Sequence, residues 1–155
     1  MDLLKRLKTA FEKVDLQDQK QLFSTIQSLH LSIDEVSQFI TPPQELEYGR
    51  NVIFRNEQAE VIIVYLPSFA KTLIHDHGTS IGGLFVVQGK LLNILYHPDE
   101  HGPLYAQTEA YSQNDIFLVK GETTHMMFNP TLSPVITFHV YTPPLKDGKS
   151  YSISK

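Results

Sequence analysis

A succession of short runs rich in β-branched and aromatic residues constrains the fold most, because it fills the chain from residue 51 to residue 141. Asn56-Glu57 and Gly89-Lys90 separate some of these runs in the manner of tight turns. Many short strands at regular spacing are typical of an antiparallel sandwich or barrel. The strands predicted in this way cover residues 51–55, 60–66, 71–77, 83–88, 90–96, 104–111, 115–119, 124–128 and 134–141.

The first part of the chain has the periodicity of amphipathic helices instead. Asp2 precedes the first helix as a helix cap, and Ser32 with Glu35 forms a capping box for a short helix that ends near Ile40. One face of the first predicted helix is apolar and carries Leu3, Leu4, Leu7, Phe11 and Val14.

These two patterns predict one domain over residues 1–155. Within it, residues 1–40 would be helical and residues 46–145 would form the barrel core. We expect a mainly β protein in which the helices cover one end or face of the barrel.

Composition excludes several classes of function. The net charge of −4 and the lack of a basic stripe argue against a nucleic-acid partner. The longest aliphatic run, from Val61 to Leu66, is too short to span a bilayer, and the N-terminus lacks the apolar region of a signal peptide. The chain has no cysteine, which rules out disulfides, cysteine-ligated zinc and a thiol nucleophile. We therefore expect a cytoplasmic protein with a small-molecule partner.

The His75-Asp76-His77 segment lies in one of the predicted strands. Side chains two residues apart point to the same face of a strand, so His75 and His77 should lie side by side, with Leu73 on the same face. A single buried histidine is usually a hydrogen-bonded core residue. Two adjacent imidazoles have little structural reason to pair, and they instead indicate part of a metal site.

The spacing of residues around these histidines resembles the two motifs of the cupin superfamily. His77 precedes Gly82 and Gly89, and His125 lies between Gly121 and Asn129. In cupins, the first motif supplies two histidines and usually a glutamate, and the second motif supplies another histidine. The glutamate position is Gly82 here, so the resemblance implies a jelly-roll-like cupin barrel with a metal site of His75, His77 and His125.

Two further pairs of residues show the same two-residue spacing. Tyr48 and Arg50 form one pair, and His139 and Tyr141 form the other. Taken singly, Arg50 is equally a surface ion-pair partner and Tyr141 a core aromatic residue. Together with the histidine motifs, however, their order and separation resemble the cysteine dioxygenase family. The matching segments are Tyr48 to Asn51, His75 to Ser80, Gly121 to His125 and Phe138 to Pro144.

The resemblance implies a role for each matched residue. His75, His77 and His125 would bind ferrous iron (Fe²⁺). Arg50 would bind the carboxylate of the substrate, with Tyr48 beside it. Tyr141 would direct its hydroxyl at the iron site, held by a hydrogen bond from His139. Thr137 would complete this relay, and the Thr142-Pro143 peptide bond would be cis.

One position departs from the animal members of the family, which link a cysteine to the active-site tyrosine by a thioether. That position is Gly82 here, and the chain has no cysteine elsewhere. Tyr141 must therefore be an unmodified phenol, as in bacterial relatives.

The resemblance implies that the protein is a dioxygenase that oxidises L-cysteine with O₂ to L-cysteine sulfinate. Two alternatives stay open: a dioxygenase for another small thiol such as 3-mercaptopropionate, and a cupin that binds a metal or ligand without catalysis. Three imidazoles also suit zinc. The sequence leaves open the physiological thiol, the metal loaded in the cell, the oligomeric state, with a monomer among the options, and the roles of Met126 and Met127.

Overall fold

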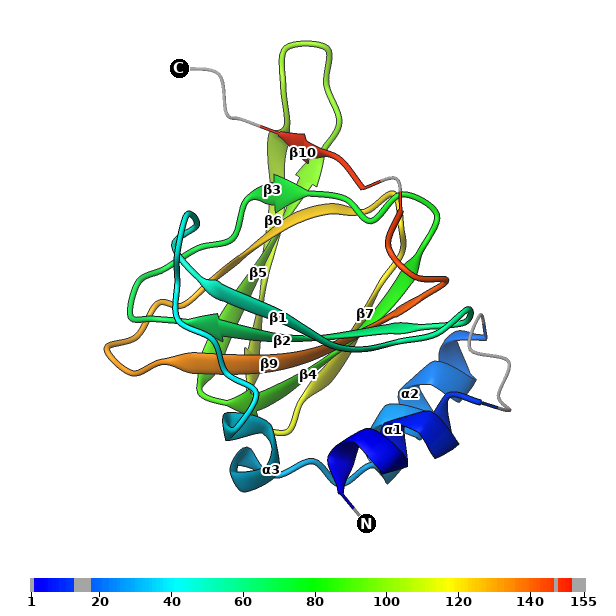
Figure 1. Ribbon diagram of the computed structural model, residues 1–155. Helices are drawn as coiled ribbons and strands as arrows, with labels where there is room; N and C mark the ends of the chain where they lie inside the picture. Colours follow the sequence, from blue (N-terminus) through cyan, green and yellow to red (C-terminus); the bar gives the residue numbers. More distant parts are fainter. Residues whose placement is uncertain (1, 13–17, 147, 152–155) are drawn as a thin grey trace.

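The computed structural model describes residues 2–12, 18–146 and 148–151. Figure 1 shows helices at the N-terminal end of the chain, followed by two antiparallel sheets that form the walls of a barrel. One five-stranded sheet has the order β1-β2-β9-β4-β7, and the other has the order β10-β3-β8-β5-β6. The strands are β1 (Gly49–Arg55), β2 (Glu60–Leu66), β3 (Ile74–His75), β4 (Ile81–Gln88), β5 (Lys90–His97), β6 (Leu104–Ser112), β7 (Ile116–Val119), β8 (Thr124–Phe128), β9 (Val135–Thr142) and β10 (Ser150–Tyr151).

The helices are α1 (Leu3–Ala10), α2 (Gln19–Ser28) and α3 (Ile33–Ser37). Both predicted caps are present, since Asp2 accepts from the Lys5 amide at 2.9 Å and Ser32 accepts from the Glu35 amide at 3.3 Å. The third helix is shorter than predicted and ends at Ser37. No helix in the described ranges is both long and apolar enough to cross a membrane.

The apolar face of α1 is narrower than the sequence predicted. The side chains of Leu3, Leu7 and Phe11 are buried against the first sheet, but Leu4 is 41% exposed. Val14 lies outside the described residues. The buried stripe therefore follows the i, i+4, i+8 positions of the helix.

Most predicted strands are confirmed, with ends that differ by one or two residues. The exception is 71–77, where only Ile74–His75 is a strand. On either side of it, the Thr72 amide donates to the Met127 carbonyl at 2.9 Å and the His77 amide donates to the Gly121 carbonyl at 2.6 Å.

This irregular path corrects the predicted side-chain pattern. Leu73 lines the same cavity as His75 and His77, as expected, but Thr72 and Asp76 at the alternate positions line it as well. Strict alternation of side chains needs a continuous ladder of strand hydrogen bonds, and the backbone leaves that ladder beyond His75. The sequence analysis also missed β10, which pairs with β3 and places Ser150 opposite His75.

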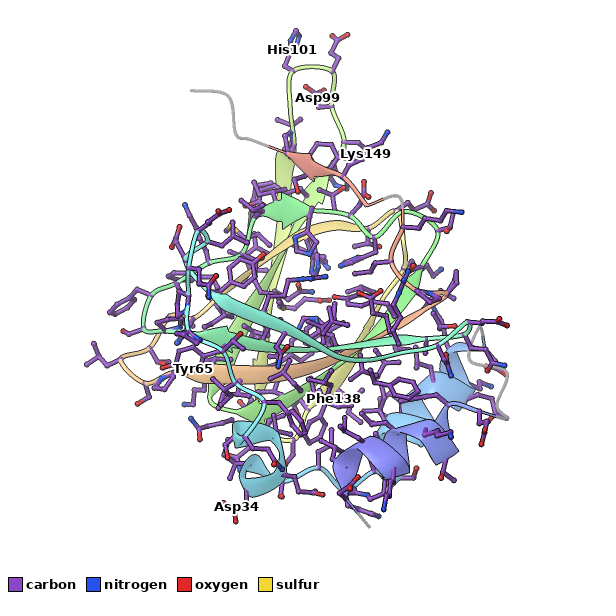
Figure 2. All side chains as sticks on the ribbon, viewed as in Figure 1. Asp34, Tyr65, Asp99, His101, Phe138 and Lys149 are labelled. Atoms are coloured by element: carbon purple, nitrogen blue, oxygen red, sulfur yellow. The ribbon has the colours of Figure 1, made fainter. Side chains whose placement is uncertain are left out.

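The first sheet separates two apolar layers. On one side, it packs against the helices, as Phe138 shows in Figure 2. On the other side, it faces the barrel interior, together with Leu91 and Met127 of the opposite sheet. Strand β9 lies between the two layers, and all eight of its residues are buried.

Candidate metal centre

Three histidines from two distant parts of the chain meet inside the barrel. His75 is on β3, His125 is its register partner on β8, and His77 follows β3 in the loop. The nitrogen atoms that they can offer lie within 4.8 Å of one another, and the ring centroids are 4.7–4.9 Å apart. By contrast, Figure 2 shows His101 at the tip of the β5–β6 hairpin, which projects beyond the barrel.

Hydrogen bonds fix the orientation of two of the rings. Nδ1 of His75 lies 2.6 Å from the carbonyl oxygen of Leu73, and Nδ1 of His125 lies 2.6 Å from Oδ1 of Asn93. Both oxygens can only accept, so Nδ1 of each ring carries the proton. The lone pair of each imidazole is therefore on Nε2, which is available for a metal ion.

Several of the ring nitrogens are buried and lack a partner among the described residues: Nε2 of His125 and both nitrogens of His77. Leaving a buried polar atom unpaired costs about 1–3 kcal/mol, so such atoms need an explanation. A divalent transition metal bound by imidazole nitrogen would provide one. The residues present thus fit a metal ion.

Burial also keeps these imidazoles unprotonated. It lowers the pKa of His77 to about 3, with a further contribution from His75. The pKa of His125 is well below its ordinary value for the same reasons, with burial the larger cause. Since only the neutral ring can bind a metal, the site is ready for one at neutral pH.

A cavity of about 320 Å³ opens beside the cluster. Its walls include Tyr48, Arg50, His75, His77 and Tyr141, and also Leu145, Lys146 and residues 148–150 near the C-terminal end of the chain. The structure thus brings residues of the four segments matched in the sequence to one place.

Arg50 lies at the mouth of this cavity, where its side chain is 41% exposed. Its Nη2 atom is 3.9 Å from Oε2 of Glu60, and the other carboxylate oxygen of Glu60, Oε1, accepts a hydrogen bond from Nε of Arg55 at 3.0 Å. Glu60 is almost fully buried and holds both arginines at one edge of the first sheet.

Tyr141 is connected by hydrogen bonds to the alternate side chains on the inward face of β9. Its hydroxyl lies 2.8 Å from Nδ1 of His139, and Nε2 of His139 lies 2.7 Å from the Thr137 hydroxyl. Burial raises the pKa of Tyr141 far above its ordinary value, so the phenol keeps its proton. Its ring stacks on His77, with centroids 4.9 Å apart.

Gly82 is the register partner of Tyr141 on β4. A Cβ atom at this position would lie 2.8 Å from Cε1 of Tyr141 and 2.7 Å from Cγ2 of Val119. Glycine therefore allows the tyrosine ring to lie directly against the backbone of β4. The Thr142-Pro143 peptide bond is cis.

The sequence analysis missed two polar residues that support the site. Asn93 is buried on β5 behind His125, and Glu60 begins β2. Each had a visible signal: Asn93 interrupts the apolar run from Leu91 to Leu95, and Glu60 precedes the aliphatic run of β2. A polar residue at an inward position of a strand needs a partner, but the sequence does not say which one.

Solved structures with similar folds share the double-stranded arrangement of sheets. A protein from Klebsiella pneumoniae described as having a double-stranded beta-helix domain matches with a TM-score of 0.61 and 18% identity, over 76% of this chain and 94% of that one. The Cnp3 cupin domain of Schizosaccharomyces pombe gives 0.58 and 15%, over 69% and 71%. An oxalate decarboxylase from Lactobacillus farciminis gives 0.60 and 17%, over 74% of this chain and 34% of that one. At these identities, the matches show a cupin fold and no more.

Comparison with protein families is more specific. The family described as cysteine dioxygenase type I matches residues 1–154, which include the N-terminal helices as well as the barrel. The histidine cluster fits the metal centre of a thiol dioxygenase. The chain therefore belongs to the cysteine dioxygenase type I family.

Proposed function

We propose that the protein oxidises L-cysteine with O₂ to L-cysteine sulfinate, transferring both oxygen atoms to sulfur, at a ferrous ion held by His75, His77 and His125. One observation carries this proposal: unpartnered imidazole nitrogens, a guanidinium and a protonated phenol surround the same cavity. Bound iron would supply the redox chemistry that joins a thiol to dioxygen. The side chains of the protein would hold the thiol and control protons around it.

The cavity is large enough for a small thiol together with dioxygen. Its volume of about 320 Å³ corresponds to about ten water molecules. L-Cysteine and dioxygen together have about nine non-hydrogen atoms, so both fit in it at the same time.

Arg50 would bind the substrate carboxylate. A guanidinium offers two parallel hydrogen bonds that match the two oxygens of a carboxylate, which lysine cannot do. Burial is the main cause of the lowered pKa of His75, but the charge of Arg50 contributes to it, so the guanidinium is electrostatically coupled to the cluster. Glu60 would limit the movement of the guanidinium from behind.

The inward side chains of β9 would direct one hydrogen bond into the cavity. If the Thr137 hydroxyl donates to Nε2 of His139, then Nδ1 of His139 carries a proton and donates to the Tyr141 oxygen. The Tyr141 proton is then free to point at the substrate or at oxygen. Because Tyr141 stays protonated, it acts as a donor at every working pH.

The charge of the ligand set suits a thiolate. Many non-haem iron oxygenases use two histidines and a carboxylate. Here, Gly82 takes the carboxylate position, so the metal would keep one more positive charge. A thiolate substrate would balance that charge, and the metal would favour its deprotonation.

A second candidate substrate is 3-mercaptopropionate, which lacks the amino group. Asp76 is the acidic side chain among the described residues that line the cavity, and both its oxygens are already engaged, by the Tyr151 hydroxyl and by the Gly78 and Lys149 amides. The lining therefore offers the substrate ammonium no free carboxylate. A thiol without the amine would therefore lose no ion pair with the lining.

Oxygen uptake and sulfinate formation by anaerobically iron-loaded protein test the proposal. We expect one sulfinate per O₂ with cysteine and loss of activity in His125→Ala. Full iron loading without turnover of cysteine, 3-mercaptopropionate or cysteamine would contradict it and favour a binding protein.

Arg50→Gln tests the carboxylate site, with Arg55→Gln as the matched control. Both arginines pair with Glu60, but only Arg50 of the two lines the cavity. We expect Arg50→Gln to raise KM for cysteine by at least tenfold and to leave cysteamine, which has no carboxylate, unaffected. An equal effect of Arg55→Gln would contradict this role for Arg50.

A further inference from the structure

The ring of His125 is held by a polar side chain, and neither of the other two histidines has such a partner among the described residues. Asn93 on β5 lies behind it, and both side chains are almost completely buried, with relative exposures of 0% and 1%. His125 donates from Nδ1 to Oδ1 of Asn93 over 2.6 Å. By contrast, the oxygen that holds His75 belongs to the backbone.

The support continues to the next strand. Nδ2 of Asn93 donates to Oε1 of Glu109 at 3.2 Å, and the Tyr111 hydroxyl donates to the same oxygen at 3.0 Å. Glu109 is the register partner of Asn93 on β6. The ring of Tyr111 is held in turn by stacking on Phe117, with centroids 4.1 Å apart and planes within 4°.

Tyr111 remains a hydrogen-bond donor to this carboxylate. Burial, followed by its bond to Glu109, raises the pKa of Tyr111 to about 12. Glu109 therefore accepts two hydrogen bonds on one oxygen, from a phenol and from an amide, and both hold it in place behind Asn93.

The direction of these bonds decides which nitrogen of His125 can bind a metal. An asparagine amide can turn over and exchange its oxygen and its NH₂ group. Because Glu109 only accepts, it keeps the NH₂ of Asn93 on its own side and the oxygen facing His125. That oxygen requires a proton on Nδ1 of His125, which leaves the lone pair on Nε2, inside the cluster. Without the carboxylate, the amide could turn, and the proton would move to the nitrogen that should bind the metal.

We propose that Asn93 and Glu109, with Tyr111 behind them, are positioning residues that set the tautomer of His125 and so the affinity of the site for a metal ion. This inference rests on the metal site described under the proposed function. It adds that hydrogen-bonded side chains, which run from the partly exposed Glu109 through Asn93, control the protonation pattern of the buried ligand His125.

Metal affinity measured without any thiol tests this role. Metal-free protein is titrated with Co²⁺ against a chelator, and the visible absorption of bound Co²⁺ reports the ligand geometry. We expect Asn93→Leu, which cannot accept a hydrogen bond, to weaken binding about 10–100-fold. Asn93→Asp keeps an acceptor and should bind Co²⁺ at least as tightly as the wild type.

Substitutions at Glu109 separate the amide orientation from simple packing. Glu109→Gln still offers an oxygen to Asn93 and should bind Co²⁺ within about threefold of wild type. Glu109→Leu offers none and should bind about tenfold more weakly. In ¹⁵N spectra of the metal-free protein, the proton of His125 should move from Nδ1 toward Nε2 in Glu109→Leu.

Asn129→Ala is the matched control for a structural role. Asn129 is equally buried, and its amide donates to the carbonyls of Leu66 and Pro67 at the end of β2 and of Ser133 before β9. We expect a lower melting temperature with unchanged Co²⁺ affinity of the folded protein.

The outcomes separate this inference from the proposed metal site. If Asn93→Leu and Glu109→Leu both keep the wild-type affinity and spectrum while His125→Ala loses binding, the positioning role is wrong and the metal site stands. Unchanged Co²⁺ binding in His125→Ala would overturn the site itself, and the positioning role with it.

Discussion

The two faces of β9 are buried to the same extent but carry different residues. Ile136, Phe138 and Val140 face the helices and belong to the apolar layer beneath them. Thr137 and His139, which alternate with these residues, face the barrel interior and are connected through hydrogen bonds to Tyr141. One strand therefore takes part in both the folding core and the candidate active site.

The difference shows that burial alone does not identify a site. Apolar burial on the helix side contributes to folding roughly in proportion to the area removed from water. Polar burial on the interior side contributes little net free energy, because each hydrogen bond replaces one to water. The polar side chains on the interior face of β9 thus keep a specific arrangement that adds little stability. The apolar side chains on the helix-facing side supply that stability instead.

The largest expected effect is on the helix-facing side. Phe138 is fully buried, so Phe138→Ala should lower the free energy of unfolding by about 3–5 kcal/mol. Urea denaturation of the metal-free protein measures this change. The fraction that remains folded should bind Co²⁺ normally. If Phe138→Ala instead lost metal binding at unchanged stability, the contrast between the two faces of β9 would be wrong.

His139→Leu changes the interior face instead. Tyr141 would lose the hydrogen bond that orients its hydroxyl, and we expect turnover of the iron-loaded protein to fall about 10–100-fold. The free energy of unfolding should change less than in Phe138→Ala, because a leucine still fills the space. A loss of stability as large as that of Phe138→Ala would show that His139 contributes mainly to folding.

The pH dependence of stability sharpens the same contrast. Burial lowers the pKa of His139 and His77, the latter to about 3, whereas an unfolded histidine has a pKa of about 6.5. Between these values, the unfolded chain binds protons that the native protein does not, so stability falls as the pH drops below about 6.5. The slope is at most about 1.4 kcal/mol per pH unit for each such histidine.

Urea denaturation of the metal-free protein between about pH 7.5 and pH 5 measures this slope. His139→Leu should reduce it by the share of one histidine, and Phe138→Ala should leave it unchanged. A slope that is the same in all three proteins would show that His139 contributes nothing to it.

The smallest expected effect is at Thr137, which is hydrogen-bonded to His139 and through it to Tyr141. Thr137→Val keeps the shape of the side chain but removes the hydroxyl next to Nε2 of His139. We expect a loss of about 1 kcal/mol in stability and only a few-fold loss in turnover. Turnover as low as in His139→Leu would show that the threonine, and not the histidine alone, sets the orientation of Tyr141.

Local patterns in the sequence predict most of the barrel and two members of the histidine cluster. Alternation along the chain predicts the strands and the pair of His75 and His77, whereas His125 was implied by the resemblance to the cupin motifs. The prediction of a continuous strand over residues 71–77 was wrong, because the backbone there donates a hydrogen bond to Gly121, a partner far along the chain. Local alternation cannot show where a strand leaves its ladder.

The supporting contacts depend on register, which the sequence leaves open. Asn93 meets Glu109 only because the β5–β6 hairpin pairs them, past an irregularity between Leu95 and Tyr96. In the same way, Tyr151 reaches Asp76 with a hydrogen bond of 2.6 Å across 75 positions of the chain. Both pairings require the folded barrel.

The contact between Gly82 and the ring of Tyr141 has a consequence for kinetic experiments. Because glycine stands at position 82 and the sequence has no cysteine, no thiol is present to form a thioether with the tyrosine as turnover proceeds. All molecules in a preparation then share one chemical form of Tyr141. Single-turnover traces should follow one exponential, free of the mixed populations that partial self-processing would create.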